Sequence, residues 1–292
     1  MDYVTEKNAV IEKNVKKSRL KFNMNKVTRY LIIVGLSAIC VLPFLWMLSA
    51  SLKAESEIFG FPIQWIPEVF YWSNYVEVWT RVPFHVFYLN SFKIALISTV
   101  LLLFTSSLGG YAFAKIKFPE RDKIFFLYVA TMMVPFQVMM IPQYMLMSKI
   151  GLVDSHWPII IINSFSAFGV FLFRQFFVSI PDELLEAARI DGLSEFGIYF
   201  RIILPLSKPA IATLIIFQFM HAWNDFLAPL IYITSEELYT LTLGMQFFVY
   251  EFDTEYSLLM AAAVSAIIPT IIVYFLAQEQ FIKGVSNTGV KG

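Results

Sequence analysis

Six long apolar runs limit what this chain can fold into. Each is close to the length of about 20 residues that an α-helix needs to cross a bilayer's hydrocarbon core. The whole chain is 58% hydrophobic, whereas soluble domains contain about 45–50% apolar residues. One soluble core could not cover all six runs, so we expect an all-α integral membrane protein with six transmembrane helices. The expected spans are 30–48, 94–114, 124–146, 158–177, 210–233 and 258–277.

Basic residues are distributed unevenly among the segments that flank these spans. The N-terminal segment and the segments after the second, fourth and sixth spans hold 18 of the 22 Lys and Arg residues, with Arg174 counted in the segment after the fourth span. The other three segments hold 4, and the loop 234–257 has no basic residue and five acidic ones. Because basic loops are retained in the cytoplasm, both termini are predicted to be cytoplasmic.

The chain is expected to form one membrane domain, residues 30–280. A basic cytoplasmic leader, residues 1–29, precedes it, and a short cytoplasmic tail, residues 281–292, follows it. The first span is interpreted as a retained anchor, since the leader is longer than that of a cleaved signal peptide. The sequence leaves the role of the leader open. The formal net charge is zero, which gives no indication of nucleic-acid binding.

Residue patterns for catalysis, metal binding or ATP binding are missing from the sequence. Cys40 is the single cysteine, and His85, His156 and His221 lie far apart in the sequence. The chain also lacks the Gly-rich G-x-x-x-x-G-K-[ST] loop that binds nucleotide phosphates. We therefore expect no catalytic residue, metal or bound cofactor, and no enzyme activity of its own.

The segment 179–206, between the fourth and fifth spans, is predicted to form two short helices. Pro181 suits a first helical turn, and Asp182 and Glu183 suit the positive end of a helix. Gly192 suits the left-handed position that ends a helix, and a second helix is expected to follow it as far as Pro205. On these grounds alone, an amphipathic turn on the membrane surface explains the segment as well as a docking site does.

Motifs in this segment favour the docking site over the amphipathic turn. Glu186-Ala187-Ala188, Gly192 four residues later and Ile203-Leu204-Pro205 resemble the "EAA" loop of binding-protein-dependent ABC importers. In that family the loop forms the coupling helices, which sit in a groove of the ATPase subunit. The resemblance therefore implies an ATPase-coupling role for this segment. The residues concerned are Glu186, Ala187, Ala188, Asp191, Gly192, Leu204 and Pro205.

Three further stretches are similar to the smaller permease subunit of the maltose-type carbohydrate importers. They are Trp223-Asn224-Asp225-Phe226, the segment Leu258–Ala263 and the ending Phe281–Gly292. The similarity runs from about residue 30 to the end of the chain. It implies the ABC type I importer permease fold in a bacterial cytoplasmic membrane, surrounded by lipid, with the tail extending between the ATPase subunits.

The implied function is ATP-driven import of a sugar or oligosaccharide by alternating access. The implied partners are a second homologous permease, two ATPase subunits that hold ATP and Mg²⁺, and an extracytoplasmic sugar-binding protein. Import of another solute, such as glycerol phosphate or a peptide, is the alternative within transport. A membrane scaffold or sensor is the alternative outside it, although a scaffold needs no ATPase dock.

Polar residues in the fifth span are costly in lipid and so point to a bundle interior or a water-filled path. Gln218, His221 and Asp225 are spaced i, i+3 and i+7, which places them on one face of a continuous helix, with Trp223 and Asn224 beside them. One hypothesis is an interhelical hydrogen-bond network that fixes packing. The other is a lining of the translocation path or its gate. In the maltose-type group the sugar is held mainly by the larger permease, so for these residues of the smaller one we favour a role in packing and gating.

Overall fold

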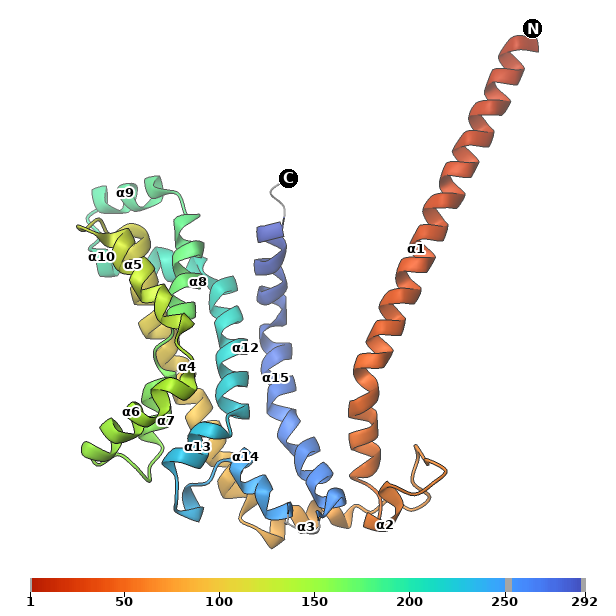
Figure 1. Ribbon diagram of the computed structural model, residues 1–292. Helices are drawn as coiled ribbons and strands as arrows, with labels where there is room; N and C mark the ends of the chain where they lie inside the picture. Colours follow the sequence, from red (N-terminus) through yellow and green to blue (C-terminus); the bar gives the residue numbers. More distant parts are fainter. Residues whose placement is uncertain (1, 250–253, 290–292) are drawn as a thin grey trace.

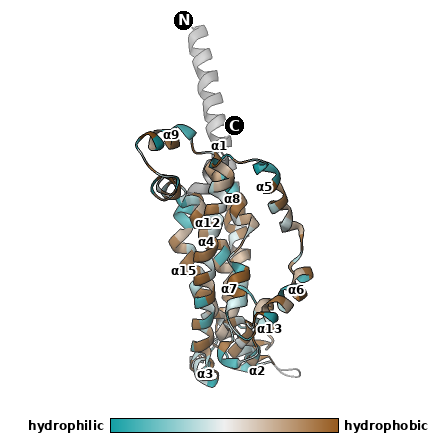
Figure 2. Cartoon of the chain, turned by 90° about the vertical axis from the view of Figure 1, so that its left-hand side faces the viewer, coloured by the Kyte–Doolittle hydropathy of each residue, from teal (hydrophilic) through white to brown (hydrophobic). Residues whose placement is uncertain are grey.

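The computed structural model describes the backbone of residues 2–249 and 254–289, and the side chains of residues 26–249, 254–280 and 282. Most of the described residues are helical, and they contain no β-strand beyond an isolated antiparallel bridge between Val249 and Thr254. The longer helices run between two ends of a bundle (Figure 1). We call the end that carries α9 the α9 end and the opposite end, which carries α3, the α3 end. Hydrophilic residues gather toward the two ends, with hydrophobic residues between them (Figure 2).

The α-helices are α1 (Asp2–Ala50), α2 (Glu55–Ile58), α3 (Ser73–Arg81), α4 (Phe84–Lys115), α5 (Arg121–Ala130), α6 (Phe136–Lys149), α7 (Trp157–Asn163), α8 (Ala167–Val178), α9 (Asp182–Ile190), α10 (Glu195–Ile198), α11 (Leu204–Leu206), α12 (Lys208–Asn224), α13 (Leu227–Tyr232), α14 (Leu241–Gly244) and α15 (Tyr256–Gly289). The 3₁₀ turns are η1 (Thr131–Met133), η3 (Glu236–Leu238) and η4 (Met245–Phe248), and η2 (Tyr199–Ile203) is a π turn.

Four helical stretches are long and apolar enough to cross a membrane, and they overlap the first, second, fourth and sixth expected spans. Two further helix pairs pass the same test but are sharply bent, and counting each pair as one crossing brings the total to six. The all-α membrane fold is therefore confirmed. The four stretches are Lys26–Ala50, Phe84–Lys115, Trp157–Val178 and Tyr256–Gln280.

The third expected span, 124–146, is not one straight helix. The stretches Arg121–Met133 and Phe136–Lys149 meet at an angle of 98°. Val134 is extended at the break, with ψ 114°, and Pro135 follows it with ψ 142°. The cause is proline chemistry: a proline disfavours the helical conformation of the residue before it and lacks the N–H that would continue the helix.

The fifth expected span, 210–233, is not one continuous helix either, so the expectation of a single helix there is wrong. α12 ends at Asn224, Asp225 is extended with ψ 124°, and α13 starts at Leu227. The carboxylate of Asp225 accepts the backbone N–H of Ala228, and its carbonyl accepts the hydroxyl of Thr242. The bond to Ala228 is local and competes with the helical pattern, and the bond from Thr242, 17 residues away, holds Asp225 in this conformation, which explains why the helix stops there.

α4 and α8 pack closely at the centre of the bundle because glycines at their contact leave room for the facing helix. A Cβ on Gly110 would lie 2.5 Å from the Cβ of Phe173, and one on Gly169 would lie 2.4 Å from Oγ of Ser106. Side chains any larger could not fit at this contact. α4 also packs against α12, which in turn packs against α15, so α4 and α12 occupy the middle of the bundle.

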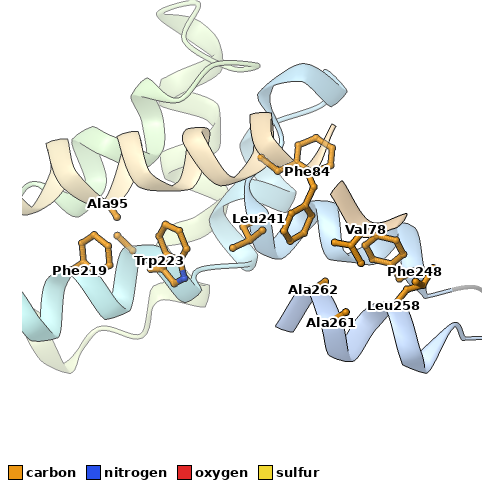
Figure 3. Packing of buried hydrophobic residues seen from close by; sticks show 12 residues of the cluster. Val78, Phe84, Ala95, Phe219, Trp223, Leu241, Phe248, Leu258, Ala261 and Ala262 are labelled. Carbon is orange, nitrogen blue, oxygen red and sulfur yellow. The ribbon is translucent and has the colours of Figure 1, made fainter. Parts of the chain in front are cut away.

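An apolar cluster near the α3 end joins α3, α4, α12, α14 and α15 (Figure 3). Phe219 and Trp223 of α12 stack on each other and lie beside Ala95 of α4. The indole N–H of Trp223, which is 2% exposed, donates to the carbonyl of Ala266 over 2.9 Å. A buried indole with a satisfied donor acts as a fixed packing element.

α1 diverges from the rest of the bundle (Figure 1). It contacts α15, and the most hydrophobic part of its apolar stretch Lys26–Ala50 contains no buried residue. α15 continues without interruption to Gly289, past residue 281, where we expected the tail to begin. Residues 1 and 290–292, the ends of the expected leader and tail, lie outside the described residues.

Candidate functional site

Residues 179–206 fold into two helical pieces at the α9 end. The first is α9, which starts directly after Pro181 rather than including it in a first turn. The second runs from Glu195 through the π turn η2 to Leu206. Ser194 caps this second piece, since its hydroxyl oxygen accepts the backbone N–H of Gly197 over 3.2 Å. The predicted pair of short helices is therefore present.

Gly192 ends α9 in the left-handed conformation that the sequence predicts, with φ +83°. Its N–H donates to the carbonyl of Arg189, and the N–H of Leu193 donates to the carbonyl of Ala188, both over 3.0 Å. This pair of bonds is the Schellman motif, which requires a positive φ at the position of Gly192. A Cβ there would meet nothing within 4 Å, so glycine is required by backbone conformation rather than by space.

The two faces of α9 differ. Leu185 and Ala188 are buried in an apolar cluster with α4, α8 and α12. On the other side of α9, Ile190 is 86% exposed; on α10, Phe196 is 68% exposed. Among the residues that the motif marks, Ala188 is buried and Leu204 is half-buried. The exposed ones are Glu186, Ala187, Asp191, Gly192 and Pro205.

Three polar side chains of α4 that the motif does not include also contact this loop. Lys115 donates from Nζ to Oδ1 of Asp182 over 2.5 Å and to the carbonyl of Ile180 over 2.6 Å. The hydroxyl of Tyr111 donates to Oε2 of Glu195 over 2.7 Å, and the hydroxyl of Ser107 bonds that of Tyr199 over 2.6 Å. The sequence signal for them was the spacing of four residues, which places all three on one face of an apolar helix.

Charge also braces the loop. Nε of Arg189 on α9 donates to Oε1 of Glu195 on α10 over 2.8 Å, which joins the two helical pieces. The hydrogen bond and the positive charge of Lys115 hold the pKa of Asp182 below its usual range. The start of α9 and the start of α10 are therefore both tied to neighbouring elements.

The polar residues of the fifth span do not form one stripe. Gln218 is buried, and its Nε2 donates to the carbonyl of Asn163 over 3.1 Å. His221 and Asn224 are exposed on α12, whereas Asp225 lies beyond the end of the helix. The expectation that Gln218, His221 and Asp225 share one helical face is thus wrong, because α12 ends before Asp225.

The α12 candidates separate into two groups. Gln218 and Trp223 make bonds inside the bundle, and Asp225 bonds the backbone of α13. His221 and Asn224 lie on the exposed side of α12, three residues apart, together with the half-exposed ring of Phe217. We call these three residues the α12 face. In the described part of the chain, no group of three or more His, Cys, Asp or Glu side chains is placed to hold a metal ion.

Residues 106–287 match the model of the family described as binding-protein-dependent transport system inner membrane component. The match covers more than half of the chain, and it includes the loop 179–206 and the α12 face. The chain belongs to this family. It is therefore a permease, a multi-pass protein of the bacterial cytoplasmic membrane, and the resemblance to binding-protein-dependent ABC importers is confirmed.

Curated relatives match the permease over most of its length. The arabinooligosaccharides transport system permease protein AraQ of Bacillus subtilis (strain 168) is 38% identical over 93% of this chain and 98% of its own length. The lactose transport system permease protein LacG of Rhizobium radiobacter is 33% identical over 91% of this chain and 96% of its own. The sn-glycerol-3-phosphate transport system permease protein UgpE of Pectobacterium atrosepticum is 34% identical over 88% and 94%.

A solved structure shares the fold of the permease. It is a chain of a bacterial ABC transporter involved in the import of the acidic polysaccharide alginate. The two align with a TM-score of 0.79 at 24% identity, over 89% of this chain and 97% of that one. The chain thus has the fold of a permease whose structure is already known.

Proposed function

We propose that the permease is one of two homologous membrane subunits of a bacterial ATP-driven importer of sugars or oligosaccharides. In this proposal the loop 179–206 docks on the ATPase subunits, which hold ATP and Mg²⁺. An extracytoplasmic sugar-binding protein delivers the substrate at the α3 end. The relatives AraQ and LacG, which are named for oligosaccharide and lactose transport, support the substrate class.

The observation that carries the docking role is the exposure of Ile190 and Phe196 on a braced loop at the α9 end. Large apolar side chains exposed on a loop outside the bundle are suited to burial against a protein partner. Leu185 and Ala188 hold the inner face of the same helix to the bundle. Movement of a partner bound to the outer face would therefore be transmitted to the bundle, because α9 is packed against it.

The second permease subunit is inferred from α1 and from the α12 face. α1 leaves the bundle with its apolar stretch uncovered, as a helix does when it reaches across to a neighbouring subunit. His221 and Asn224 are polar side chains on the exposed side of a membrane-spanning helix. Such residues face protein or a water-filled cavity rather than lipid. We therefore place the second subunit, and the path between the two, against the α12 face.

The chemistry of the α12 face favours a neutral sugar. An aromatic ring, an imidazole and an amide can pack on and hydrogen-bond a sugar, and the sequence has no Lys or Arg between Pro209 and Asn224. A phosphate substrate calls for cationic donors such as Arg or Lys. Glycerol phosphate, the substrate in the name of the UgpE relative, is therefore the second candidate.

The proposed mechanism is alternating access. Closure of the ATPase subunits on ATP would move α9 and α10, and the helices tied to them would turn so that the path opens toward the α3 end. The tail beyond residue 281 would extend between the ATPase subunits. The basic leader, residues 1–29, has no assigned role.

Substitution of Gly192 by Val tests the coupling role. A β-branched residue at φ +83° carries backbone strain of about 1–2 kcal/mol or more and would misplace the two helical pieces. Gly151 is a matched control, since it also has a positive φ, +73°, and a Cβ added there would meet nothing within 4 Å, but it lies outside the loop. Gly192→Val should abolish uptake of radiolabelled oligosaccharide at a normal membrane level, and Gly151→Val should not.

Glu186→Lys is a second test, since it reverses an exposed charge on α9. We expect uptake to fall strongly, and Glu186→Asp, which keeps the charge at the same place, serves as the control. Normal uptake with both Gly192→Val and Glu186→Lys would rule out the docking role. A screen of the cognate binding protein with sugars and with glycerol phosphate then decides the substrate class.

A further inference from the structure

We propose that Ser107, Tyr111 and Lys115 act as positioning residues that transmit movement of the loop 179–206 to the helix bundle through α4. We call these three residues the α4 ladder. The inference rests on the proposed docking of this loop on ATPase subunits, and it adds the route by which the movement leaves the loop. None of the three belongs to the motif that marks the loop.

The α4 ladder contacts the loop at three heights. Its members are four residues apart, so they lie one above another on the same side of α4 and span about 12 Å of helix. Each bonds a different part of the loop: Lys115 the start of α9, Tyr111 the start of α10, and Ser107 the π turn η2. Because the loop is bonded to α4 at three places along the helix, it cannot rotate about any one of these bonds without breaking the others.

The α4 side chains of these contacts are shielded from water, whereas the partner carboxylates are open to it: the side chain of Asp182 is 73% exposed and that of Glu195 is 47% exposed. Ser107 is 2% exposed, Tyr111 is 4% exposed, and the side chain of Lys115 is 4% exposed. Breaking one of these bonds in the intact protein is costly on the α4 side, because the buried ammonium or hydroxyl group of α4 would be left unpaired and out of reach of water. The ion pair between Arg189 and Glu195 joins α9 to α10. The loop and the end of α4 should therefore move as one body.

α4 is mechanically suited to carry that movement. The loop continues directly into α8 on one side and α12 on the other, but both routes are interrupted. The helix is broken between Asn163 and Ala167 ahead of α8, and the chain bends by 76° where it enters α12. α4 is continuous from Phe84 to Lys115 and packs against both α8 and α12. A push at the α9 end is thus carried along α4 to the α3 end.

The test uses the assembled importer in lipid vesicles with its loaded binding protein, and it measures sugar imported per ATP hydrolysed. Tyr111→Phe removes one hydroxyl, and Lys115→Met removes one charge with its two hydrogen bonds. Lys115→Arg keeps the charge and the donors. The control variants are Tyr128→Phe and Lys117→Met, which lie outside the α4 ladder.

We expect Tyr111→Phe and Lys115→Met to lower the import per ATP by about 2- to 30-fold, while complex yield and melting temperature stay near those of the controls. Lys115→Arg should restore most of the ratio. An unchanged ratio in both variants would overturn the inference. So would a lower yield or melting temperature in complexes that keep a normal ratio, because the residues would then serve stability alone.

Glu186→Lys in the same assay separates this inference from the proposed function. If Glu186→Lys lowers the ratio and the α4 ladder variants do not, the loop couples to ATP but the route through α4 is wrong. If Glu186→Lys and Gly192→Val also leave import at its full rate, the proposed docking of the loop is wrong.

Discussion

A single carboxylate, that of Asp154, accepts both hydrogen-bond donors of Ser235. The N–H of Ser235 donates to Oδ1 over 2.8 Å and its hydroxyl to Oδ2 over 2.5 Å, and the N–H of Thr234 adds a third bond over 2.9 Å. Asp154 itself adopts a left-handed conformation, with φ +60°, and its N–H donates to the carbonyl of Tyr232. Two loops that are 81 residues apart in the sequence are thereby fixed together at the α3 end.

These bonds make the contact dependent on pH. The hydroxyl and N–H of Ser235, followed by the N–H of Thr234, hold the pKa of Asp154 well below the ordinary 3.8. A carboxyl whose pKa is lower in the folded state stabilises the fold at a pH above its unfolded value, and this contribution is lost as the pH falls through the folded-state pKa. We therefore expect the stabilisation from this contact to be complete at neutral pH, to begin to shrink below about pH 4, where the unfolded chain takes up the proton, and to be lost once the pH falls through the folded-state pKa.

Asp154→Asn should remove this contribution at neutral pH, because an amide has one acceptor oxygen where the carboxylate has two. Hydrogen exchange of the amides of Thr234 and Ser235 should become faster in the variant at pH 7. Glu236→Gln, an exposed carboxylate in the same loop, should leave the exchange rates unchanged. Equal protection of both amides in Asp154→Asn and the unmodified protein would contradict the assignment.

The topology predicted from the 18-to-4 asymmetry of basic residues is tested by labelling. In a Cys40→Ala background, cysteines at Lys117 and Ser194 should be shielded from impermeant thiol reagents in intact cells, and a cysteine at Glu237 should react. Ser194 lies at the α9 end and Glu237 in the loop after α13, at the α3 end. Labelling of Ser194 from outside would refute this orientation.

The contact between α4 and α8 predicts a stability effect at Gly110. Its Cβ position lies 2.5 Å from the Cβ of Phe173 and 3.0 Å from the backbone nitrogen of Arg174, so Gly110→Ala must push the helices apart. We expect a loss of about 1–3 kcal/mol, typical of overpacking, measured as a lower melting temperature in detergent. Gly35→Ala is the control, since nothing lies within 4 Å of a Cβ there. A Gly110→Ala variant as stable as Gly35→Ala would contradict the close contact.

The α12 residues predict two different outcomes. Gln218→Leu should lower the melting temperature, since it removes the buried bond to Asn163 and leaves that carbonyl without this donor. His221→Ala and Asn224→Ala, on the exposed α12 face, should change uptake affinity or sugar preference with stability nearly unchanged. Parallel melting and uptake measurements on the three variants check this. Loss of stability in His221→Ala and Asn224→Ala with unchanged uptake would show that these residues serve packing alone.

Local features of the chain were enough to predict several parts of the structure. The apolar runs predict membrane-spanning helices, because a helix satisfies its own backbone hydrogen bonds in lipid. Gly192 predicts the end of α9, because glycine alone adopts a positive φ without a steric penalty there. Two short helices follow from the capping and proline positions around them. Each of these results depends on residues within one or two helical turns of each other.

The tertiary structure decided what depends on partners distant in the sequence. The backbone carbonyl of Asp225 accepts the hydroxyl of Thr242, 17 residues away, at the point where α12 has ended, and the apolar residues around Asp225 give no sign of this bond. The α4 ladder, Ser107, Tyr111 and Lys115, finds its hydrogen-bond partners only when residues 180–199 fold back onto α4. The sequence by itself determined that this chain crosses a membrane and that residues 179–206 form two short helical pieces, and the coupling role of these pieces stays a prediction. Which polar groups meet was decided by packing, because a hydrogen bond between distant residues needs both partners brought within about 3 Å.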